Sequence, residues 1–357
     1  MLTLIFRARS LAAGVVVLLL PFSGLHAADV QNGQAVYAST CAVCHGPAGE
    51  PDPNSPVVQG LEVVPADLSD PLFNSREPTG DWEMVVMHGG HAMGLAAQMP
   101  PHKDALNDEQ VADVTAYVKS LVDTRAYPPG EMNLFLPTRT KKAFPEDEVV
   151  YKGRYSNEPG ENPLKSVLEL EKRIGKRGQG ILELVHVDDA LRSEITEVEV
   201  GYKHALSWSA QHILSGAVVY AVPVDSSDSD GELQTYLAYG TELSPAWILQ
   251  GSLRLKFPMD KASDGEAELA GALHYVHSPW PRRVFPALEI VAERPYKSRN
   301  GDLEWTALPQ VRIGLTRGGH VALNLALELP LSGQSWDNRA YLTLLWDFAD
   351  GGFFKGW

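Results

Sequence analysis

The only two cysteines of the 357-residue chain stand close together, in the stretch CAVCHG at residues 41–46. Cys41 and Cys44 are three positions apart, and His45 follows the second of them directly. Residues at positions i and i+3 of a helix share a face, so both sulfur atoms can reach one partner. Two thiols at this spacing could form a redox-active dithiol, contribute to a zinc site or bind a cofactor covalently.

The histidine after the second cysteine separates these alternatives. C-x-x-C-H is the attachment signature of c-type haem, in which each thiol adds to a vinyl group of the porphyrin and the histidine binds the iron. A zinc site would need two further ligands, typically from a second cluster, and none is evident in the sequence. We therefore expect Cys41 and Cys44 to hold one haem c covalently, with His45 as the proximal iron ligand.

The first 27 residues have the order of a secretory signal peptide. Arg7 and Arg9 precede an apolar run, Leu11–Leu20, which Pro21 interrupts before small residues near Ala27. The run is too short to span a bilayer comfortably, so we expect cleavage near Ala27 rather than a membrane anchor. Export implies an oxidising compartment, in which two cysteines would otherwise pair as a disulfide.

The charge of the chain excludes one class of partner. The net charge is −15, and without the two arginines of the leader 28 basic residues stand against 45 acidic ones. Binding to nucleic acid needs the opposite sign, so we expect no nucleic-acid partner. An acidic surface suits docking to a basic redox partner and also favours solubility, and charge alone does not separate these two roles.

Residues 28–125 are predicted to form a small helical domain. Helical periodicity is clearest over residues 107–122, where Asn107 can cap the helix and Gln110 completes a capping box. A shorter helix is predicted for NGQAVYAST, directly before the cysteines. The residues that share the apolar face of the last helix are Val111, Val114, Val118 and Leu121.

Both ends of this region resemble the class I cytochrome c family. CAVCHG matches the haem-binding motif of its N-terminal helix, and Met99-Pro100 followed by the helix from Asn107 matches its distal loop and C-terminal helix. The resemblance covers residues 29–122, with a variable middle. It implies Met99 as the distal iron ligand, with Met93 as the alternative and the other methionine packing on the haem. The histidines expected to be surface or loop residues instead are His88, His91 and His102.

Ligation by histidine and methionine has a functional consequence. A thioether opposite histidine raises the reduction potential relative to two histidines, and a six-coordinate haem has no open position for a substrate. The expected activity is therefore one-electron transfer rather than an enzymatic reaction. A peroxidase that sheds its methionine is a weaker alternative, because no catalytic pair of histidine and arginine is obvious beside the haem.

Beyond a proline- and charge-rich stretch at 126–147, predicted as a linker, the hydrophobic period changes from 3.6 to 2. Residues 247–257 (WILQGSLRLKF) and 321–329 (VALNLALEL) alternate strictly between apolar and mostly polar positions. A repeat of about 36 residues fits one β-hairpin per period. Six periods over 148–357 predict about twelve antiparallel strands. The prolines that mark the repeat are Pro223, Pro258, Pro295 and Pro330.

The alternation leaves open which face meets water. A soluble sandwich or barrel would bury its apolar face, whereas an outer-membrane barrel turns it toward lipid and lines its interior with polar residues. Two observations favour an up-and-down outer-membrane barrel over 148–357. The polar faces carry charged residues, and tryptophans lie near the strand ends. The charged residues concerned are Glu197, Glu199, Lys203, Arg254, Lys256 and Arg312.

The chain as a whole resembles porin–cytochrome fusions, which implies electron transfer at the outer membrane, with lipid around the barrel. With an even number of strands both barrel termini face the periplasm, so we expect the cytochrome domain there. The loops after Pro223 and Pro258 should then face outward, and short turns such as TRGGH at 316–320 inward. The alternative is a soluble periplasmic cytochrome subunit whose β-rich domain binds a dehydrogenase.

Overall fold

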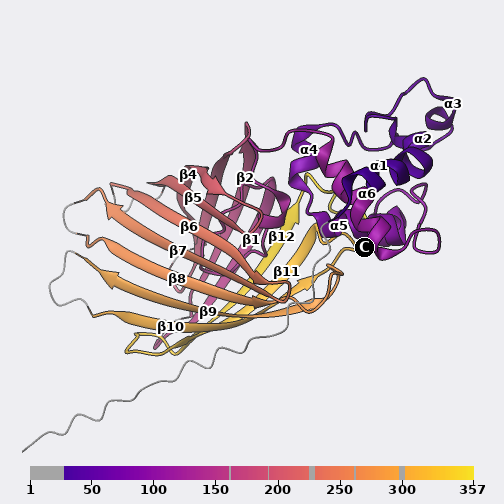
Figure 1. The fold of residues 1–357 in the computed structure, drawn as a ribbon. Coiled ribbons are helices and arrows are strands. Elements are labelled where there is room, and N and C mark those ends of the chain that lie inside the picture. The colour runs from indigo at the N-terminus through magenta and orange to yellow at the C-terminus, as the bar shows by residue number, and fades with distance from the viewer. Residues whose placement is uncertain (1–27, 161, 192, 225–229, 261–262, 297–301) are drawn as a thin grey trace, which may run out of the picture.

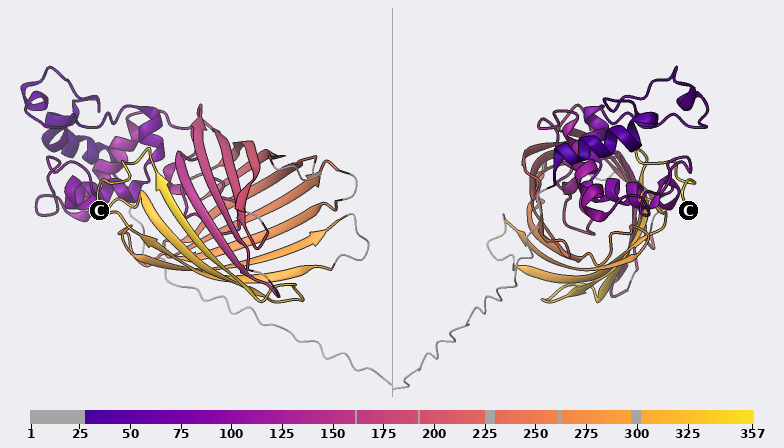
Figure 2. Two further views of the ribbon diagram at one scale, coloured as in Figure 1. Left: turned by 180° about the vertical axis from the view of Figure 1, so that it is seen from behind. Right: turned by 45° about the vertical axis from the view of Figure 1, so that its right-hand side comes forward.

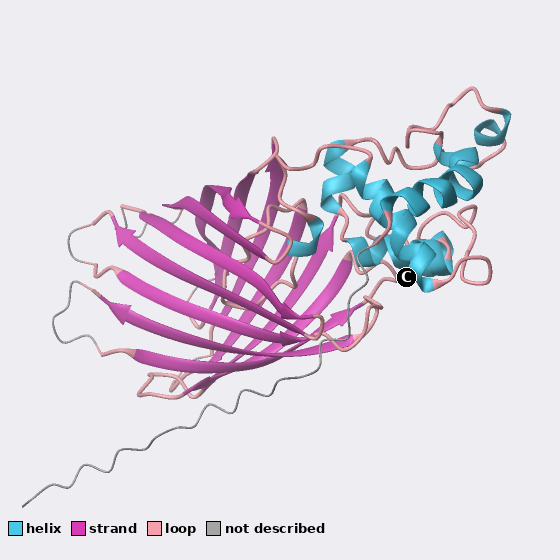
Figure 3. Cartoon of the chain, in the orientation of Figure 1, coloured by secondary structure: helices cyan, strands magenta, loops and turns pink. Residues whose placement is uncertain are grey.

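The computed structural model describes residues 28–357 apart from 161, 192, 225–229, 261–262 and 297–301. A small helical domain sits at one end of a closed β-barrel (Figures 1 and 3). The predicted signal peptide, residues 1–27, lies outside the described residues. Among the helices of the described part, none has both the length and the apolar character needed to cross a membrane.

The helical domain is built from short elements around one long helix. Its last helix, α6, has the predicted capping box: Asn107 Oδ1 accepts from the Gln110 backbone N–H at 2.9 Å, and Gln110 Oε1 accepts from the Asn107 N–H at 3.1 Å. The elements are α1 (Val30–Val36), the π-helical turn η1 (Tyr37–Cys41), α2 (Ala42–His45), α3 (Pro56–Gln59), α4 (Pro71–Arg76), α5 (Thr79–His88), the 3-10 turn η2 (Gly90–Met93), α6 (Asp108–Ser120) and the 3-10 turn η3 (Gly130–Met132).

Helix α1 crosses α6 at a glycine. A Cβ atom on Gly33 would lie 2.0 Å from the carbonyl oxygen of Asp113, so only glycine lets the two backbones approach this closely. The Asp113 carboxylate also holds the start of α1, because it accepts from the Asp29 N–H at 2.6 Å and from Asn32 Nδ2 at 2.7 Å. This crossing fixes the cysteine-bearing turn against the last helix.

The barrel has twelve antiparallel strands, each paired with its neighbours in sequence, and β1 pairs with β12 to close the sheet. The predicted number of strands and the up-and-down order are confirmed. The strands are β1 (Glu148–Asn157), β2 (Leu164–Ile174), β3 (Gly178–Asp188), β4 (Ser193–Trp208), β5 (His212–Pro223), β6 (Glu232–Ser244), β7 (Trp247–Pro258), β8 (Glu266–Tyr275), β9 (Val284–Pro295), β10 (Glu304–Gly314), β11 (Val321–Pro330) and β12 (Asn338–Asp347).

The apolar face of the sheet points outward. On β7, Leu249 and Leu253 are 38% and 44% exposed, whereas Gln250 and Ser252 between them are 1% and 4% exposed. On β11 the same order holds, with exposed leucines on either side of the fully buried Glu328. This distribution is the reverse of that in a water-soluble barrel and is the one found in transmembrane barrels. The prediction that the polar faces line the interior is confirmed.

The tryptophans only partly follow the expected interfacial pattern. Trp247 and Trp305 lie at the ends of β7 and β10 and are exposed, as residues at a membrane–water interface would be. Trp336 is instead buried in the connection from β11 to β12, with the Arg339 guanidinium 4.2 Å from its ring centre. Trp336 therefore packs inside the protein and does not belong to an interfacial belt.

The two ends of the barrel differ in their connections. The helical domain and the C-terminus lie at the end where residues 175–177, 209–211 and 245–246 form short turns (Figures 1 and 2). TRGGH at 316–320 is at this end, and the loops after the marker prolines are at the other, as predicted. Parts of three of those loops, 225–229, 261–262 and 297–301, lie outside the described residues.

Residues 133–147, within the predicted linker, run inside the barrel and return to the start of β1 (Figure 2). We call them the lumen segment. Their backbone carbonyls accept hydrogen bonds from wall side chains on several sides: Gln250 Nε2 at 2.7 Å, Asn324 Nδ2 at 2.7 Å and Ser215 Oγ at 2.6 Å. The stretch therefore does more than connect two domains.

The α1–α6 crossing gives a first prediction. We expect Gly33→Ala to lower the unfolding free energy of the helical domain by about 1–3 kcal/mol, because the new methyl group collides with backbone. Gly80→Ala is the matched control, since a Cβ there meets nothing within 4 Å. Denaturant titration followed by circular dichroism and haem absorbance measures both variants. Equal midpoints for the two would show that the crossing tolerates a side chain.

Candidate functional site

The two cysteines lie one helical turn apart at the start of the helical domain. Cys41 ends the π-helical turn η1, Cys44 lies in α2, and both thiols are free. Burial, and then the neighbouring Cys44, raise the pKa of Cys41 to about 11. Because the thiolate is the reactive form, a pair whose first thiol stays protonated at neutral pH is poorly suited to disulfide exchange. The geometry instead leaves two adjacent thiols for one cofactor.

His45 is held in the orientation that an iron ligand needs. Its Nδ1 lies 3.2 Å from the carbonyl oxygen of Ala66. A carbonyl can only accept, so Nδ1 carries the proton and Nε2 carries the lone pair. Such a bond to the second ring nitrogen accompanies most metal-bound histidines. Burial lowers the pKa of His45, which favours the neutral, ligating form.

The indole N–H of Trp82 lacks a hydrogen-bond acceptor among the described residues, which is independent evidence for a bound group. Its indole Nε1 is buried and has no hydrogen-bond partner in the part of the chain that the structure describes. The ring packs against Phe73, at 5.7 Å between ring centres, and under the Lys119 ammonium group at 5.1 Å. Buried indole N–H groups usually find an acceptor, and a haem, which bears carboxylates, could supply one. The residues present therefore fit a haem.

Both candidate distal methionines lie in the loop from α5 to α6, in different surroundings. Met93 is buried, and its carbonyl faces the barrel: a Cβ on Gly318 would be 2.8 Å from the Met93 oxygen. Met99 is partly exposed and closes the loop on the helical domain, where its carbonyl accepts from the Gly90 N–H at 3.0 Å. The barrel therefore accounts for the position of the Met93 backbone but not for that of Met99.

Two of the loop histidines contact the barrel, which the sequence did not indicate. Arg317 Nη1 lies 2.9 Å from His91 Nε2 and also donates to the His91 carbonyl at 3.1 Å. The His88 ring lies 4.9 Å from that of Trp280. The hydrogen bonds of His102 in the described chain run through its backbone: its N–H donates to Val86 of α5, and its carbonyl accepts from Ala105 and Leu106. The first two are thus interface residues.

The helical domain is also joined to the C-terminal tail of the barrel through an ion pair, and to the lumen segment through η3. Arg76 pairs with Glu77 at 3.2 Å and with Asp350 of the C-terminal tail at 3.4 Å. Glu131 in η3 accepts from the backbone N–H of Thr79 at 3.1 Å and from its hydroxyl at 2.6 Å. These contacts fix the helical domain on the rim of the barrel. We call the contact region around Arg76, Asp350 and Glu131 the seat of this domain.

Comparison with known proteins agrees with the geometry of the helical domain. Residues 30–122 match the family model described as Cytochrome c, which identifies them as a cytochrome c domain, as inferred from CAVCHG and Met99-Pro100. Such a domain carries haem and transfers electrons.

Some of the solved structures similar to the chain are described as porins. A structure described as KdgM porin has 10% identity and a TM-score of 0.42, and covers 56% of this chain and 98% of that one. A NanC porin structure has 9% identity and a TM-score of 0.44, with the same coverage. OccK11 (OpdR) of Pseudomonas aeruginosa has 13% identity and a TM-score of 0.32, and covers 55% of this chain and 63% of that one.

The carboxylates at the seat of the helical domain give a prediction on pH. Burial, and then Asp350, raise the pKa of Glu77 to about 7 and that of Asp81 to about 6. Because these values exceed the ordinary ones, the folded state binds more protons than the unfolded state. We expect the unfolding free energy of this domain to fall as pH rises from about 4.5 to about 7.

Glu77→Gln should flatten this pH dependence, and Glu50→Gln, at an exposed carboxylate of the same domain, should leave it unchanged. Denaturant midpoints between pH 4.5 and 8 measure the slope for the full-length protein and both variants. A slope in Glu77→Gln as steep as that of the parent would contradict the assignment to this cluster.

Proposed function

We propose that this protein is a one-electron carrier that is held at the outer membrane by its β-barrel. One haem c is bound covalently through Cys41 and Cys44, with His45 and Met99 as the axial ligands. The observation that carries the proposal is the combination, within a cytochrome c domain, of two free thiols one turn apart with a histidine whose Nδ1 is fixed by Ala66. The haem supplies the one-electron couple.

The residues of the chain would bind the haem, orient its histidine ligand and set its reduction potential. The thiols fix the haem to η1 and α2, and the Ala66 carbonyl keeps the ring of His45 in one orientation. Met99 is the proposed distal ligand because its loop closes on the helical domain, whereas the Met93 backbone docks against Gly318 of the barrel. A thioether ligand opposite histidine would raise the reduction potential relative to two histidines.

The outer surface of the barrel supports a lipid environment. Leu237, Leu253 and Leu269 face each other across β6, β7 and β8 and are 48%, 44% and 58% exposed. Water-soluble proteins rarely expose apolar side chains in contiguous rows of this kind. The soluble dehydrogenase subunit is therefore the weaker alternative, since its β-domain would need a partner that covers the whole barrel.

The connections support a periplasmic position of the haem. In outer-membrane barrels the short turns face the periplasm and the longer loops face outside. The helical domain shares its end of the barrel with the short turns and with both barrel termini (Figure 2). Electrons would then enter and leave on the periplasmic side.

The acidic surface next to the haem attachment motif supports the proposal that the redox partner has a basic docking surface. Residues 46–75 contain no lysine or arginine, and all five acidic residues within them are exposed. Charge complementarity of this kind speeds up the encounter between redox proteins and orients them. The five acidic residues are Glu50, Asp52, Glu62, Asp67 and Asp70.

The distal ligand can be tested with paired variants. We expect Met99→Ala to abolish the methionine–iron charge-transfer band of the oxidised protein, to lower the midpoint potential and to allow carbon monoxide to bind the reduced haem. Met93→Ala should retain all three parental properties. Absorbance spectra, redox titration and carbon monoxide binding measure them. The reverse pattern would assign Met93 as the distal ligand. If both variants kept the charge-transfer band, neither of these two methionines would be the ligand.

The location can be tested with cells that express the full chain. We expect haem staining in the outer-membrane fraction, with release only by detergent. A protease added to intact cells should leave the cytochrome domain uncut, and permeabilising the outer membrane should expose it to cleavage. Haem in the soluble periplasm after lysis without detergent would rule out the membrane anchor, and cleavage in intact cells would reverse the orientation.

A further inference from the structure

The interior of the barrel suggests a second activity. We propose that the barrel is a cation-selective pore that the lumen segment, residues 133–147, holds closed, with Arg139 fastening the tip of the segment. The proposal depends on the membrane location argued above but not on the haem or its ligands. It follows from three features: a charged wall, a separate segment that fills the space, and the way in which this segment is attached.

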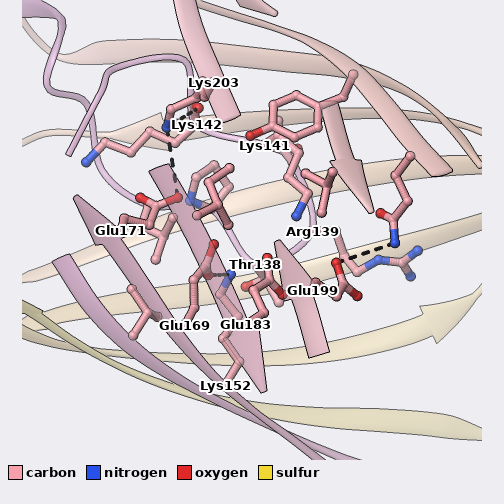
Figure 4. Close-up of a pocket in the computed structure, with 18 residues that line it drawn as sticks. Thr138, Arg139, Lys141, Lys142, Lys152, Glu169, Glu171, Glu183, Glu199 and Lys203 are labelled. Carbon is pink, nitrogen blue, oxygen red and sulfur yellow. Dashed lines mark hydrogen bonds and ion pairs between the residues drawn. The ribbon is translucent and has the colours of Figure 1, made fainter. Parts of the chain in front are cut away.

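The wall of the lumen is lined with charged side chains. Figure 4 shows wall residues Lys152, Glu169, Glu183 and Lys203 pointing into the same space as Lys141 and its neighbours in the lumen segment. The cavity that remains among these side chains is about 40 Å³, room for very few water molecules. A charged lining of this kind is typical of barrels with water-filled interiors, but here a chain segment takes the place of the water.

The tip of the lumen segment is held by carboxylates of the wall. The Arg139 guanidinium donates to Glu268 at 2.5 Å and to Glu328 at 2.7 Å, and it also pairs with Glu293. Glu268 and Glu328 are 1% and 0% exposed. The Arg139 backbone N–H donates to Glu289 at 3.0 Å. Removing one partner of such a buried cluster leaves uncompensated charge and is strongly unfavourable.

The base of the segment is sealed differently, by apolar contact. Phe144 is fully buried and packs, with Met132 and Ala143, against wall residues that include Ile213 and Ala238. The segment thus blocks the lumen twice. A layer of apolar side chains lies near the helical domain, and a cluster of ion pairs lies deeper in the barrel.

The attachment of the segment is compatible with its removal. The sheet closes through β1 and β12 without any contribution from it. Among the described residues, no backbone–backbone hydrogen bond joins residues 134–146 to a strand; the bonds run from wall side chains, such as Gln250 and Asn324, to segment carbonyls. The segment could therefore leave the lumen without breaking the β-ladder.

The charges predict the selectivity of the opened pore. Withdrawal of residues 134–144 removes Arg139, Lys141 and Lys142 from the lumen. Glu268 then keeps Arg254 and Glu328 keeps Arg339 as partners, whereas Glu289 has no ion-pair partner among the described wall residues. Rings of carboxylates favour the passage of cations over anions. Glu131, two residues before the segment, is bonded to Thr79 of the haem-bearing domain, so the seat of that domain and the closure of the pore are physically linked.

The experiment records the conductance of the full-length, haem-loaded protein in planar lipid bilayers. One variant replaces residues 134–144 by glycine and serine at equal length, and a second carries Arg139→Gln. The control, Arg125→Gln, removes an arginine that is exposed and outside the barrel. Faster migration of unheated samples on gels and retention of the haem stain verify folding of the barrel and the cytochrome domain.

We expect the parent and Arg125→Gln to remain silent. The replacement variant should show stepwise currents, with a reversal potential in a potassium chloride gradient that indicates cation preference, and Arg139→Gln should show brief openings because the apolar base still seals. A folded replacement variant that is as silent as the parent, or a parent that conducts steadily, would overturn the proposal. Silence of folded Arg139→Gln would overturn the role of Arg139 as the fastening residue.

Discussion

The pairing of charged side chains inside the barrel is the constraint on which the rest of the structure depends. Turning the apolar face toward lipid forces polar and charged side chains inward, where each unpaired charge is costly. The lumen segment supplies partners: Arg139 pairs with Glu268 and Glu328, and Lys142 pairs with Glu148. Because the segment must return to the start of β1, it enters and leaves at the same end of the barrel. The domain that precedes it is therefore placed at that end.

The same constraint keeps the haem-bearing domain outside the lumen. With the interior filled by residues 133–147, the domain rests on the rim through polar contacts such as Arg76–Asp350 and Arg317–His91. Its own fold depends on a different interaction, the close approach of α1 and α6 at Gly33. The cytochrome domain and the barrel thus have separate cores, and the lumen segment is the element that couples them. On the proposed function, electrons exchange on one side of the membrane only.

Local patterns in the sequence were enough to predict the elements but not the partners of the lumen segment. Strict alternation around Ser252 predicted the strand, and Asn107 predicted the start of α6. The alternation left open which face meets water, and the charge on the polar faces favoured their position inside the barrel. The partners of Arg139 lie 129 and 189 residues away in the sequence, so its role depends on tertiary pairing that a single sequence does not reveal. The signal available in the sequence for a role of this segment was the group of basic residues within 139–142, just after the apolar stretch NLFLP. Pro100 distinguished Met99 from Met93 in the sequence, but the contact of the Met93 backbone with Gly318 of the barrel could not be predicted from it.

The distribution of charge also changes what the acidic composition implies about a partner. Several acidic side chains of the barrel are buried in the lumen, where Glu268 and Glu328 pair with Arg139 and Glu289 accepts from the Arg139 backbone N–H. A redox partner in solution would not encounter them, so the net charge of −15 is a poor guide to the docking surface. The informative stretch is residues 46–75, directly after the haem attachment motif, where carboxylates are exposed and basic residues are absent from the sequence. The inference of a basic partner therefore rests on this surface of the cytochrome domain, and it would hold even if the barrel were neutral.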